Sequence, residues 1–349
     1  MRKKLIFMLL LSSIILVFLA GCGQYSASNT SNDKKGEKGS NQSSSVSKAT
    51  YQFKLGHQAP ENSNYQKFSQ LFKEKLEKKT GGNASVSIYP FRQLGADREL
   101  LEAMQLQTLD FGVISGPPVS QFAPQVSLVD LPFLFNDWEH VNQFVFSDAG
   151  KEFMGLTEDA NLKMLGVMNR GFRHVTNNKG PIETIEDFQG LSIRVIESDF
   201  YTASYKALEA NPQQMNWGDA YTGLEQGAID AQENTLDIIH DEKVDEVQKY
   251  VSKTGIHFVF AYLMASKPIL DNLPDKIQQA VMEAAAEAGQ EISKENEAND
   301  EKYEEILKEK GMEINNFDRS QFDGRFDEVY ELYTKKYGDD LLKKIQSIE

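Results

Sequence analysis

The hydrophobic residues after residue 50 follow two periods in turn, one of about two residues and one of about 3.6. Segments 51–55, 86–88 and 109–114 are predicted to be strands, and segments 65–76 and 100–104 are predicted to be helices. Asn62 or Ser63 is placed to cap the first helix, and Gly81-Gly82 to end it. This β-α-β-α-β order predicts a largely parallel sheet with helices on both faces.

A helix–turn–strand pattern occurs twice in the chain. Segment 101–112 runs from an apolar helix to the pair Leu109-Asp110, and segment 221–232 runs with the same spacing to Ile229-Asp230. The repetition predicts two lobes of related α/β build. Two such lobes that face each other leave a crevice at the carboxyl ends of their strands, where ligands bind.

The first residues resemble an export signal. Arg2, Lys3 and Lys4 precede an apolar stretch from 5 to 20, which is short for a membrane span and suits a secretory signal. The ending Leu19-Ala20-Gly21-Cys22 looks like a bacterial lipobox, whose cysteine becomes lipidated after cleavage. The alternatives are an uncleaved anchor helix and a buried structural cysteine. Residues 23–47 are rich in Ser, Asn, Lys and Gly, and predict a flexible tether.

Charge and cysteine content narrow the class of partner. The formal net charge is −15, which argues against nucleic acid and anionic membrane surfaces as partners. An anionic ligand must therefore be held by local positive groups. The chain has a single Cys, so the fold depends on its core and not on an internal disulfide.

The C-terminal part predicts helices. Segment 274–310 has apolar residues at helical spacing among dense Glu and Lys, and is read as one or two amphipathic helices packed along both lobes. A coiled coil or partner-binding helix is the alternative. A further aromatic-rich helix is predicted over 322–337.

Arg194 is the charged residue with the most unusual position. It lies in the middle of the alternating strand Leu191-Ser192-Ile193-Arg194-Val195-Ile196, where a charge is costly unless it has a partner. The residue pattern allows two interpretations: a structural salt bridge to a nearby Asp or Glu, or an arginine that binds a ligand.

Several segments resemble the substrate-binding subunits of TRAP transporters, of the C4-dicarboxylate-binding type. These segments are Tyr89-Pro90 followed by Gln93-Leu94-Gly95, then Gly171-Phe172-Arg173-His174-Val175-Thr176-Asn177, then Leu191 to Val195, and then Gly227 to Asn234. The resemblance extends from Tyr51 to the end. It implies an α/β, two-lobed periplasmic-binding-protein-like fold (type II solute-binding), with long C-terminal helices that pack across both lobes.

The resemblance also implies site roles. Arg194 would clamp a ligand carboxylate through two parallel N–H donors, which a lysine does not offer. Arg173 is a second candidate for the anion, and Asn234 would hydrogen-bond the ligand. Gln93 is either a polar contact from the opposite lobe or a local turn residue. Trp217 is either near the cavity or in the core.

Two residues depart from the family pattern. Thr235 follows the Gln-Glu-Asn segment where the family usually has Pro, and Arg92 stands where a small polar residue is usual. If Arg92 points into the cleft it would hold a second carboxylate or hydroxyl groups; otherwise it is a solvated charge. The ligand is thus expected to be a C4-dicarboxylate or a sugar acid such as a hexuronate.

These observations give the expected organisation of the chain. Residues 1–21 are a signal peptide and 22–49 a lipid-anchored linker; 50–170 with about 257–300 form one lobe, and 171–256 with about 301–349 the other. The expected partners are a small organic acid, the small and large integral membrane subunits of a TRAP transporter, and the membrane through lipidated Cys22, so that the protein works outside the cytoplasm. No cofactor, metal or catalytic residue is expected.

Other functions were compared with this one. An enzyme is disfavoured because the chain lacks G-x-S-x-G, H-E-x-x-H and C-x-x-C motifs and its histidines are scattered. A sensory ligand-binding lipoprotein and a solute binder of another transporter class remain as alternatives, since they share the fold and the arginine.

Overall fold

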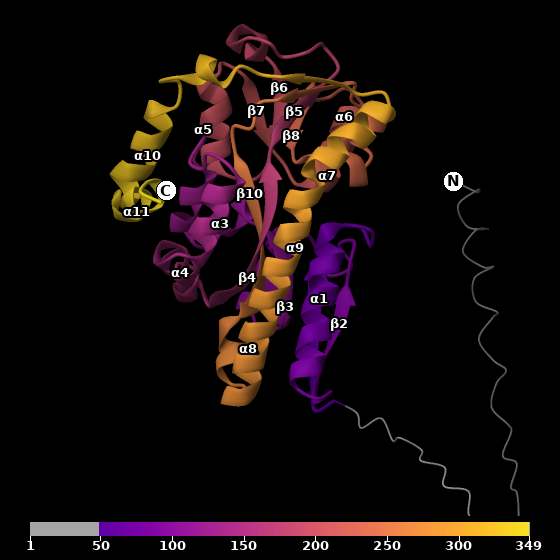
Figure 1. Ribbon diagram of the computed structural model, residues 1–349, viewed down its shortest axis with the longest axis vertical. Coiled ribbons are helices and arrows are strands. Elements are labelled where there is room, and N and C mark those ends of the chain that lie inside the picture. Colours follow the sequence, from indigo (N-terminus) through magenta and orange to yellow (C-terminus); the bar gives the residue numbers. More distant parts are fainter. Residues whose placement is uncertain (1–48, 349) are drawn as a thin grey trace, which may run out of the picture. The chain divides into compact units, whose positions relative to one another are not determined.

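The computed structural model describes residues 49–348, whose strands form two mixed sheets (Figure 1). The strands of the first sheet are β1 (Tyr51–His57), β2 (Ala84–Tyr89), β3 (Phe111–Ser115), β4 (Leu162–Phe172) and β10 (Phe258–Ser266). The strands of the second are β5 (His174–Asn177), β6 (Ser192–Val195), β7 (Asn211–Gln214), β8 (Ala231–Asn234), β9 (Tyr250–Lys253) and β11 (Glu313–Asn316). Their orders are β2-β1-β3-β10-β4 and β11-β9-β5-β8-β6-β7.

The predicted parallel sheets are only partly parallel. The β1–β2 and β1–β3 pairs are parallel as predicted. The β6–β7 and β6–β8 pairs are parallel too, although β7 was not predicted, but β10 runs antiparallel between β3 and β4, and β5 antiparallel between β8 and β9. The reversal comes from β4, β5, β9 and β10, which the sequence analysis did not identify. Every residue of β10 is buried, so its sequence is a continuous apolar run without alternation.

Helices cover these sheets (Figure 1). Those in the described residues are α1 (Asn64–Lys79), α2 (Asp97–Gln105), α3 (Trp138–Phe146), α4 (Asp148–Gly155), α5 (Asp199–Ala207), α6 (Trp217–Glu225), α7 (Leu236–Asp241), α8 (Lys267–Asp271), α9 (Asp275–Glu309), α10 (Asp327–Tyr337) and α11 (Asp340–Gln346). The predicted cap of α1 is Ser63, whose hydroxyl accepts from the Gln66 N–H.

The repeated unit found in the sequence corresponds to α2–β3 and α6–β8. In each copy the aspartate before the strand accepts a hydrogen bond from the backbone of the neighbouring strand. Asp110 accepts from Lys54 N of β1 at 2.8 Å, and Asp230 accepts from Ser192 N of β6 at 3.0 Å. The two halves therefore use the same residue type to fix the same strand-to-strand junction.

The C-terminal helices contact elements of both sheets, as predicted. Segment 274–310 forms one helix, α9, which packs on α1 and β4 in the first half of the molecule and on α7 and β11 in the second. It lies so close to β4 that a Cβ atom at Gly289 would be 2.5 Å from the Val167 carbonyl oxygen. The helix predicted over 322–337 is α10, which begins only at Asp327. α10 contacts α5, and α11 contacts α4.

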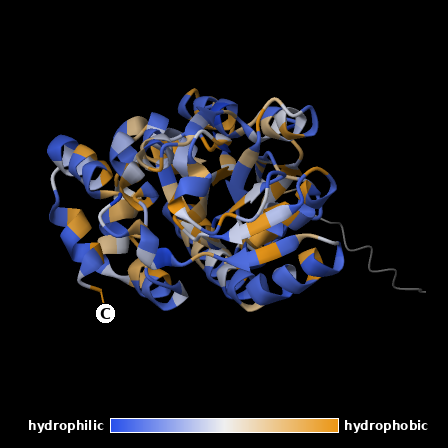
Figure 2. Cartoon of the chain, turned by 90° about the horizontal axis from the view of Figure 1, so that it is seen from above, coloured by the Kyte–Doolittle hydropathy of each residue, from blue (hydrophilic) through white to orange (hydrophobic). Residues whose placement is uncertain are grey.

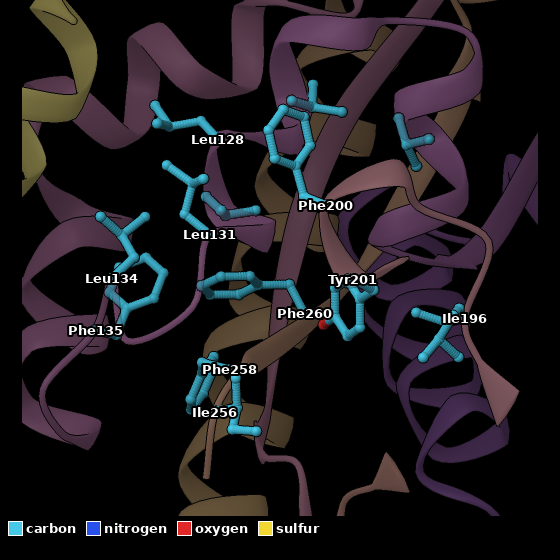
Figure 3. Close-up of a cluster of buried hydrophobic side chains, with 14 of the residues drawn as sticks. Leu128, Leu131, Leu134, Phe135, Ile196, Phe200, Tyr201, Ile256, Phe258 and Phe260 are labelled. Atoms are coloured by element: carbon cyan, nitrogen blue, oxygen red, sulfur yellow. The ribbon is translucent and has the colours of Figure 1, made fainter. Parts of the chain in front are cut away.

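One hydrophobic core runs through elements that belong to both sheets. In Figure 3, Phe258 and Phe260 of β10 lie near Phe135 on one side and Tyr201 on the other. Figure 2 shows that the helices carry hydrophilic residues on part of their surface and hydrophobic residues on the rest. This shared core joins the two halves along one side.

The predicted signal peptide (1–21), lipidated Cys22 and almost all of the predicted linker (22–49) lie outside the described residues. Within residues 49–348, no helix is long and apolar enough to span a membrane. No group of three or more His, Cys, Asp or Glu side chains in this part of the chain is arranged to hold a metal ion.

Candidate functional site

A cavity of about 400 Å³ of empty space lies between the two sheets. Its walls come from elements on both sides: Gln58, Ala59, Tyr65, Ser115, Arg170, Arg173, Arg194, Ile196, Trp217, Asn234, Ile238 and Glu242. A second space of about 420 Å³ adjoins it, and both are lined by Gln58, Arg194, Ile196 and Trp217.

Arg194 lies on β6, which the alternation of the strand had located, and is 2% exposed. Its Nε and Nη2 atoms donate to the Met215 carbonyl oxygen at 3.0 and 2.8 Å. Nη1 has no hydrogen-bond partner in residues 49–348, and no carboxylate there forms an ion pair with the guanidinium. The predicted structural salt bridge is therefore not what the structure contains.

The surroundings of Arg194 leave it charged. Burial, followed by the charge of Arg173, lowers the pKa of Arg194 to about 10, which is still well above neutral pH. The Trp217 ring centroid lies 5.5 Å from the guanidinium carbon. A buried cation without a counter-charge is costly, and an anion in the cavity removes that cost.

Arg173 has a carboxylate partner within the protein. It lies between β4 and β5, is 1% exposed, and forms a two-point ion pair with the fully buried Glu233, in which Nη2 donates to Oε1 at 2.7 Å. Its Nη1 donates to the Asn234 side-chain oxygen at 3.1 Å. Much of the Arg173 donor capacity is thus committed before any ligand arrives.

Asn234 and Trp217 also line the cavity. The side-chain oxygen of Asn234 accepts from Arg173 and from the Thr235 N–H, while its amide nitrogen has no hydrogen-bond partner among the described residues. Trp217 begins α6, is 9% exposed, and packs with Leu236 in a hydrophobic cluster. Trp217 was expected either near the cavity or in the core, and it is in both positions, since it lines the cavity and belongs to a hydrophobic cluster.

The structure does not bring Gln93 or Arg92 into the cavity lining. Gln93 lies in the turn after β2 and is exposed. Arg92 adopts a left-handed backbone (φ 61°), and its Nη1 would be 2.4 Å from a Cβ atom at Gly218, at the start of α6. Arg92 therefore reaches across to the opposite side, outside both cavities. Glycine at 218 permits that approach.

Arg170 is a third arginine of the cavity, and no pattern in the sequence pointed to it. It donates to the Tyr65 hydroxyl oxygen at 3.2 Å and to Thr235 Oγ1 at 3.0 Å, and lies 3.7 Å from Asp237. The pairing of β4 with β10 is irregular here, and Gly171 has φ +138°. Such a bulge redirects side chains, so Arg170 and Arg173 reach the same cavity although strict alternation would separate them.

Thr235, which departs from the family pattern, has a definite role in this geometry. Its hydroxyl accepts from Arg170 and donates to Asp237 Oδ1. Proline at this position has no side-chain hydroxyl, so this chain fixes the start of α7 differently. The departure therefore adds a polar link behind the cavity.

Known proteins resemble this chain in sequence and in architecture. The family model described as bacterial extracellular solute-binding protein, family 7, matches residues 55–336. A solute-binding protein of Verminephrobacter eiseniae is 32% identical over 80% of this chain and 83% of its own length. The 2,3-diketo-L-gulonate-binding periplasmic protein of Escherichia coli is 28% identical over 88% and 94%. A TRAP periplasmic solute-binding protein of Polaromonas sp. JS666, solved with D-erythronate, is 30% identical, with a TM-score of 0.81 over 86% of this chain and 99% of its own.

Proposed function

This chain belongs to the bacterial extracellular solute-binding protein family 7, and from that premise we propose that it captures a small organic acid through Arg194 and delivers it to a TRAP transporter. The family is one of solute binders and not of enzymes. The ligands named for the relatives, 2,3-diketo-L-gulonate and D-erythronate, are both organic acids. The partners are a small and a large integral membrane subunit, and Cys22 supplies a lipid anchor outside the cytoplasm.

One observation carries the proposal. Arg194 is a buried cation that lines the cavity between the two sheets, with a free Nη1 and no ion-pair partner in the described residues. A planar guanidinium with free N–H groups matches the two oxygens of a carboxylate. The ligand carboxylate would thus complete the charge balance that the protein leaves open.

Other groups add the remaining affinity. Micromolar binding corresponds to about −8 kcal/mol, more than one charged pair supplies. The Asn234 amide nitrogen and the remaining N–H groups of Arg173 and Arg170 would donate to the same carboxylate or to a nearby hydroxyl. Trp217 would cover the ligand, and expulsion of water would strengthen each polar contact.

Release and capture require the two lobes to open and close. The proposed lobes are 50–170 with about 257–300, and 171–256 with about 301–349. Side-chain contacts cross the boundary between these lobes, among them Asn64 Nδ2 to Asp237 Oδ2 at 3.2 Å, Arg170 Nη2 to Thr235 Oγ1 at 3.0 Å, and Ser198 Oγ to Asp130 Oδ2 at 2.8 Å. Opening would have to break or rearrange contacts of this kind.

The test is the pair of substitutions Arg194→Lys and Arg194→Gln in the full chain. Thermal-shift screening of organic acids with the wild-type protein first identifies a ligand. Calorimetry should then show at least about 100-fold weaker binding in both variants, because neither side chain offers the bidentate fork. Their unfolding temperatures without ligand should fall only modestly, because the hydrogen bonds to the Met215 carbonyl oxygen are lost but no ion pair is.

Arg325→Lys is the matched control, since Arg325 is exposed and does not line either cavity. It should bind the acid as the wild type does. Binding within threefold of wild type by folded Arg194→Lys would remove the arginine clamp from the proposal. A ligand that is neutral and indifferent to Arg194→Gln would reject capture of an acid altogether.

A further inference from the structure

A third space, which we call the α9 cavity, lies beside β4 and has α3, α4 and α9 as its other walls. It encloses about 910 Å³ of empty space. Asn169 of β4 lines it, whereas the next residue of the strand, Arg170, lines the cavity that holds Arg194. Two consecutive residues of one strand therefore face two different spaces, and the α9 cavity is separate from the site of the proposed function.

The walls of the α9 cavity are mainly apolar. Side chains of this kind come from α3, α4 and β4, namely Val145, Phe146, Met154, Leu165 and Val167. Phe146 is 61% exposed, so a large apolar surface is left in contact with water unless something covers it. The charged residues of the lining are Lys294 and Glu297, whose charges cancel. This lining suits a neutral molecule with an apolar body, because apolar cavities bind apolar molecules.

The space does not result from loose packing of α9. Gly166 of β4 lines the cavity, and a Cβ atom there would lie 2.4 Å from the Ala285 carbonyl oxygen of α9. Gly289 of α9 approaches the Val167 carbonyl oxygen equally closely. The helix and the strand are thus in backbone contact beside the cavity, so α9 cannot move further inward to fill it.

Asn169 has one polar atom without a partner at this wall. The residue is 2% exposed. Its backbone N–H donates to Ser293 Oγ at 2.9 Å, and its carbonyl oxygen accepts from Asn296 Nδ2 at 2.8 Å. Its side-chain Nδ2 donates to Asn142 Oδ1 at 2.9 Å, whereas Oδ1 is buried and has no partner in residues 49–348. A buried acceptor without a partner is destabilising, and a donor on a bound molecule would remove that cost.

Neighbouring groups fix the orientation of the Asn169 amide. Asn142 Nδ2 donates to Glu297 Oε2 at 3.1 Å, so Asn142 turns its oxygen toward Asn169. Asn169 has to meet that oxygen with its nitrogen, which leaves Oδ1 as the free atom. The free group is therefore an acceptor, and a matching ligand has to supply a donor.

We propose that the α9 cavity is a second binding site, which takes a small neutral molecule with an apolar body and one N–H or O–H group. The apolar body covers Phe146 and the apolar side chains of α3, α4 and β4, and the N–H or O–H group donates to Asn169 Oδ1. The site uses none of the residues around Arg194. It goes beyond the proposed function, because its ligand is neutral and not an acid.

The probes are indole and 1-methylindole, which share a ring system and differ in the N–H donor. Calorimetry on the full chain should show that indole binds about tenfold more tightly, because methylation removes the donor to Asn169. In Asn169→Leu, which has a side chain of similar size without the acceptor, this preference should disappear. The readout is a ratio of two affinities for one variant, so it holds even where the substitution lowers stability.

A pair of tryptophan substitutions on α9 locates the site. Ala286 is exposed and lines the cavity, so Ala286→Trp should fill the space and weaken indole at least about tenfold. Ala298→Trp is the matched control, since Ala298 is exposed on the same helix and does not line the cavity; it should leave the affinity unchanged. Arg194→Gln should also leave it unchanged.

Each contrary result rejects a defined part of the inference. Loss of indole binding in Arg194→Gln, or equal effects of the two tryptophan variants, would overturn the α9 cavity as the binding site. Equal affinities of indole and 1-methylindole for the wild type would overturn the contact with Asn169. Failure of both probes to bind would overturn the inference as a whole, while capture of an acid by Arg194 would stand.

Discussion

Replacement of Glu233 by Gln tests whether charge balance inside the cavity wall governs both stability and binding. Glu233 is fully buried and gives both carboxylate oxygens to Arg173, which is 1% exposed. Glutamine has the same shape, but it removes the negative charge and places an NH₂ group against the guanidinium. Arg173 and Arg194 would then be two buried cations without an ion-pair partner in the described residues.

The expected loss of stability is about 3–5 kcal/mol, the range for removing one partner of a buried pair. For the roughly 300 residues of the described part, the entropy of unfolding converts this into a fall in Tm of about 5–8 °C. Differential scanning calorimetry on the full chain at pH 7 measures it. With the organic acid present, the variant should regain more Tm than the wild type does, because the ligand supplies the missing negative charge.

Glu331→Gln is the control for Glu233→Gln. It removes the same charge from an ion pair with Lys335 at 2.7 Å on α10, where the two side chains are 62% and 75% exposed. Such an exposed pair contributes little to stability, so Tm should move by no more than about 1 °C. An unchanged Tm in Glu233→Gln, or an equal fall in both variants, would refute the charge-balance reasoning.

Two further predictions concern pH and anchoring. Burial raises the pKa of Asp130 from 3.8 to about 7. Between these two pH values the folded state holds a proton that the unfolded state has released. The contribution of this group to stability is therefore full below about pH 4 and lost as the pH rises through 7. Asp130→Asn should therefore lose less stability than the wild type between pH 5 and pH 8, by on the order of 2 kcal/mol in urea unfolding; parallel curves would contradict the shift. Cys22→Ser should abolish incorporation of radiolabelled fatty acid and release the protein from the membrane fraction, whereas a labelled Ser variant would exclude Cys22 as the lipidation site.

Local patterns in the sequence predict much of the fold. Where they fail, the failure has a physical cause. The alternation around Arg194 located its strand, and Ser63 was one of two predicted caps. The long strand β10 was missed because its residues are all buried, and a short continuous apolar run does not distinguish strand from helix. With β10 unseen, the antiparallel order of the sheet centre could not be predicted.

The candidate site was predictable only in part, because some of its residues are brought together by features that a local pattern does not show. Arg194, Arg173, Trp217 and Asn234 lie in segments that resemble the family, and the structure brings all four to one cavity. Arg170 reaches it through an irregularity in β4, which strict alternation does not anticipate. Asp97 and Glu197, which line the adjoining space, come from segments a hundred residues apart, so only the tertiary structure brings them together.

The single helix α9 has a mechanical consequence for ligand capture. It is 35 residues long, roughly 50 Å, and is fastened to β4 at one end and to β11 and α7 at the other. Long helices curve gently and kink sharply only at features such as proline, and α9 contains no proline. A change in the angle between the halves would therefore have to bend α9 gently or shift its contacts with β11 and α7, so substitutions at those contacts should change the apparent affinity without altering any residue of the cavity.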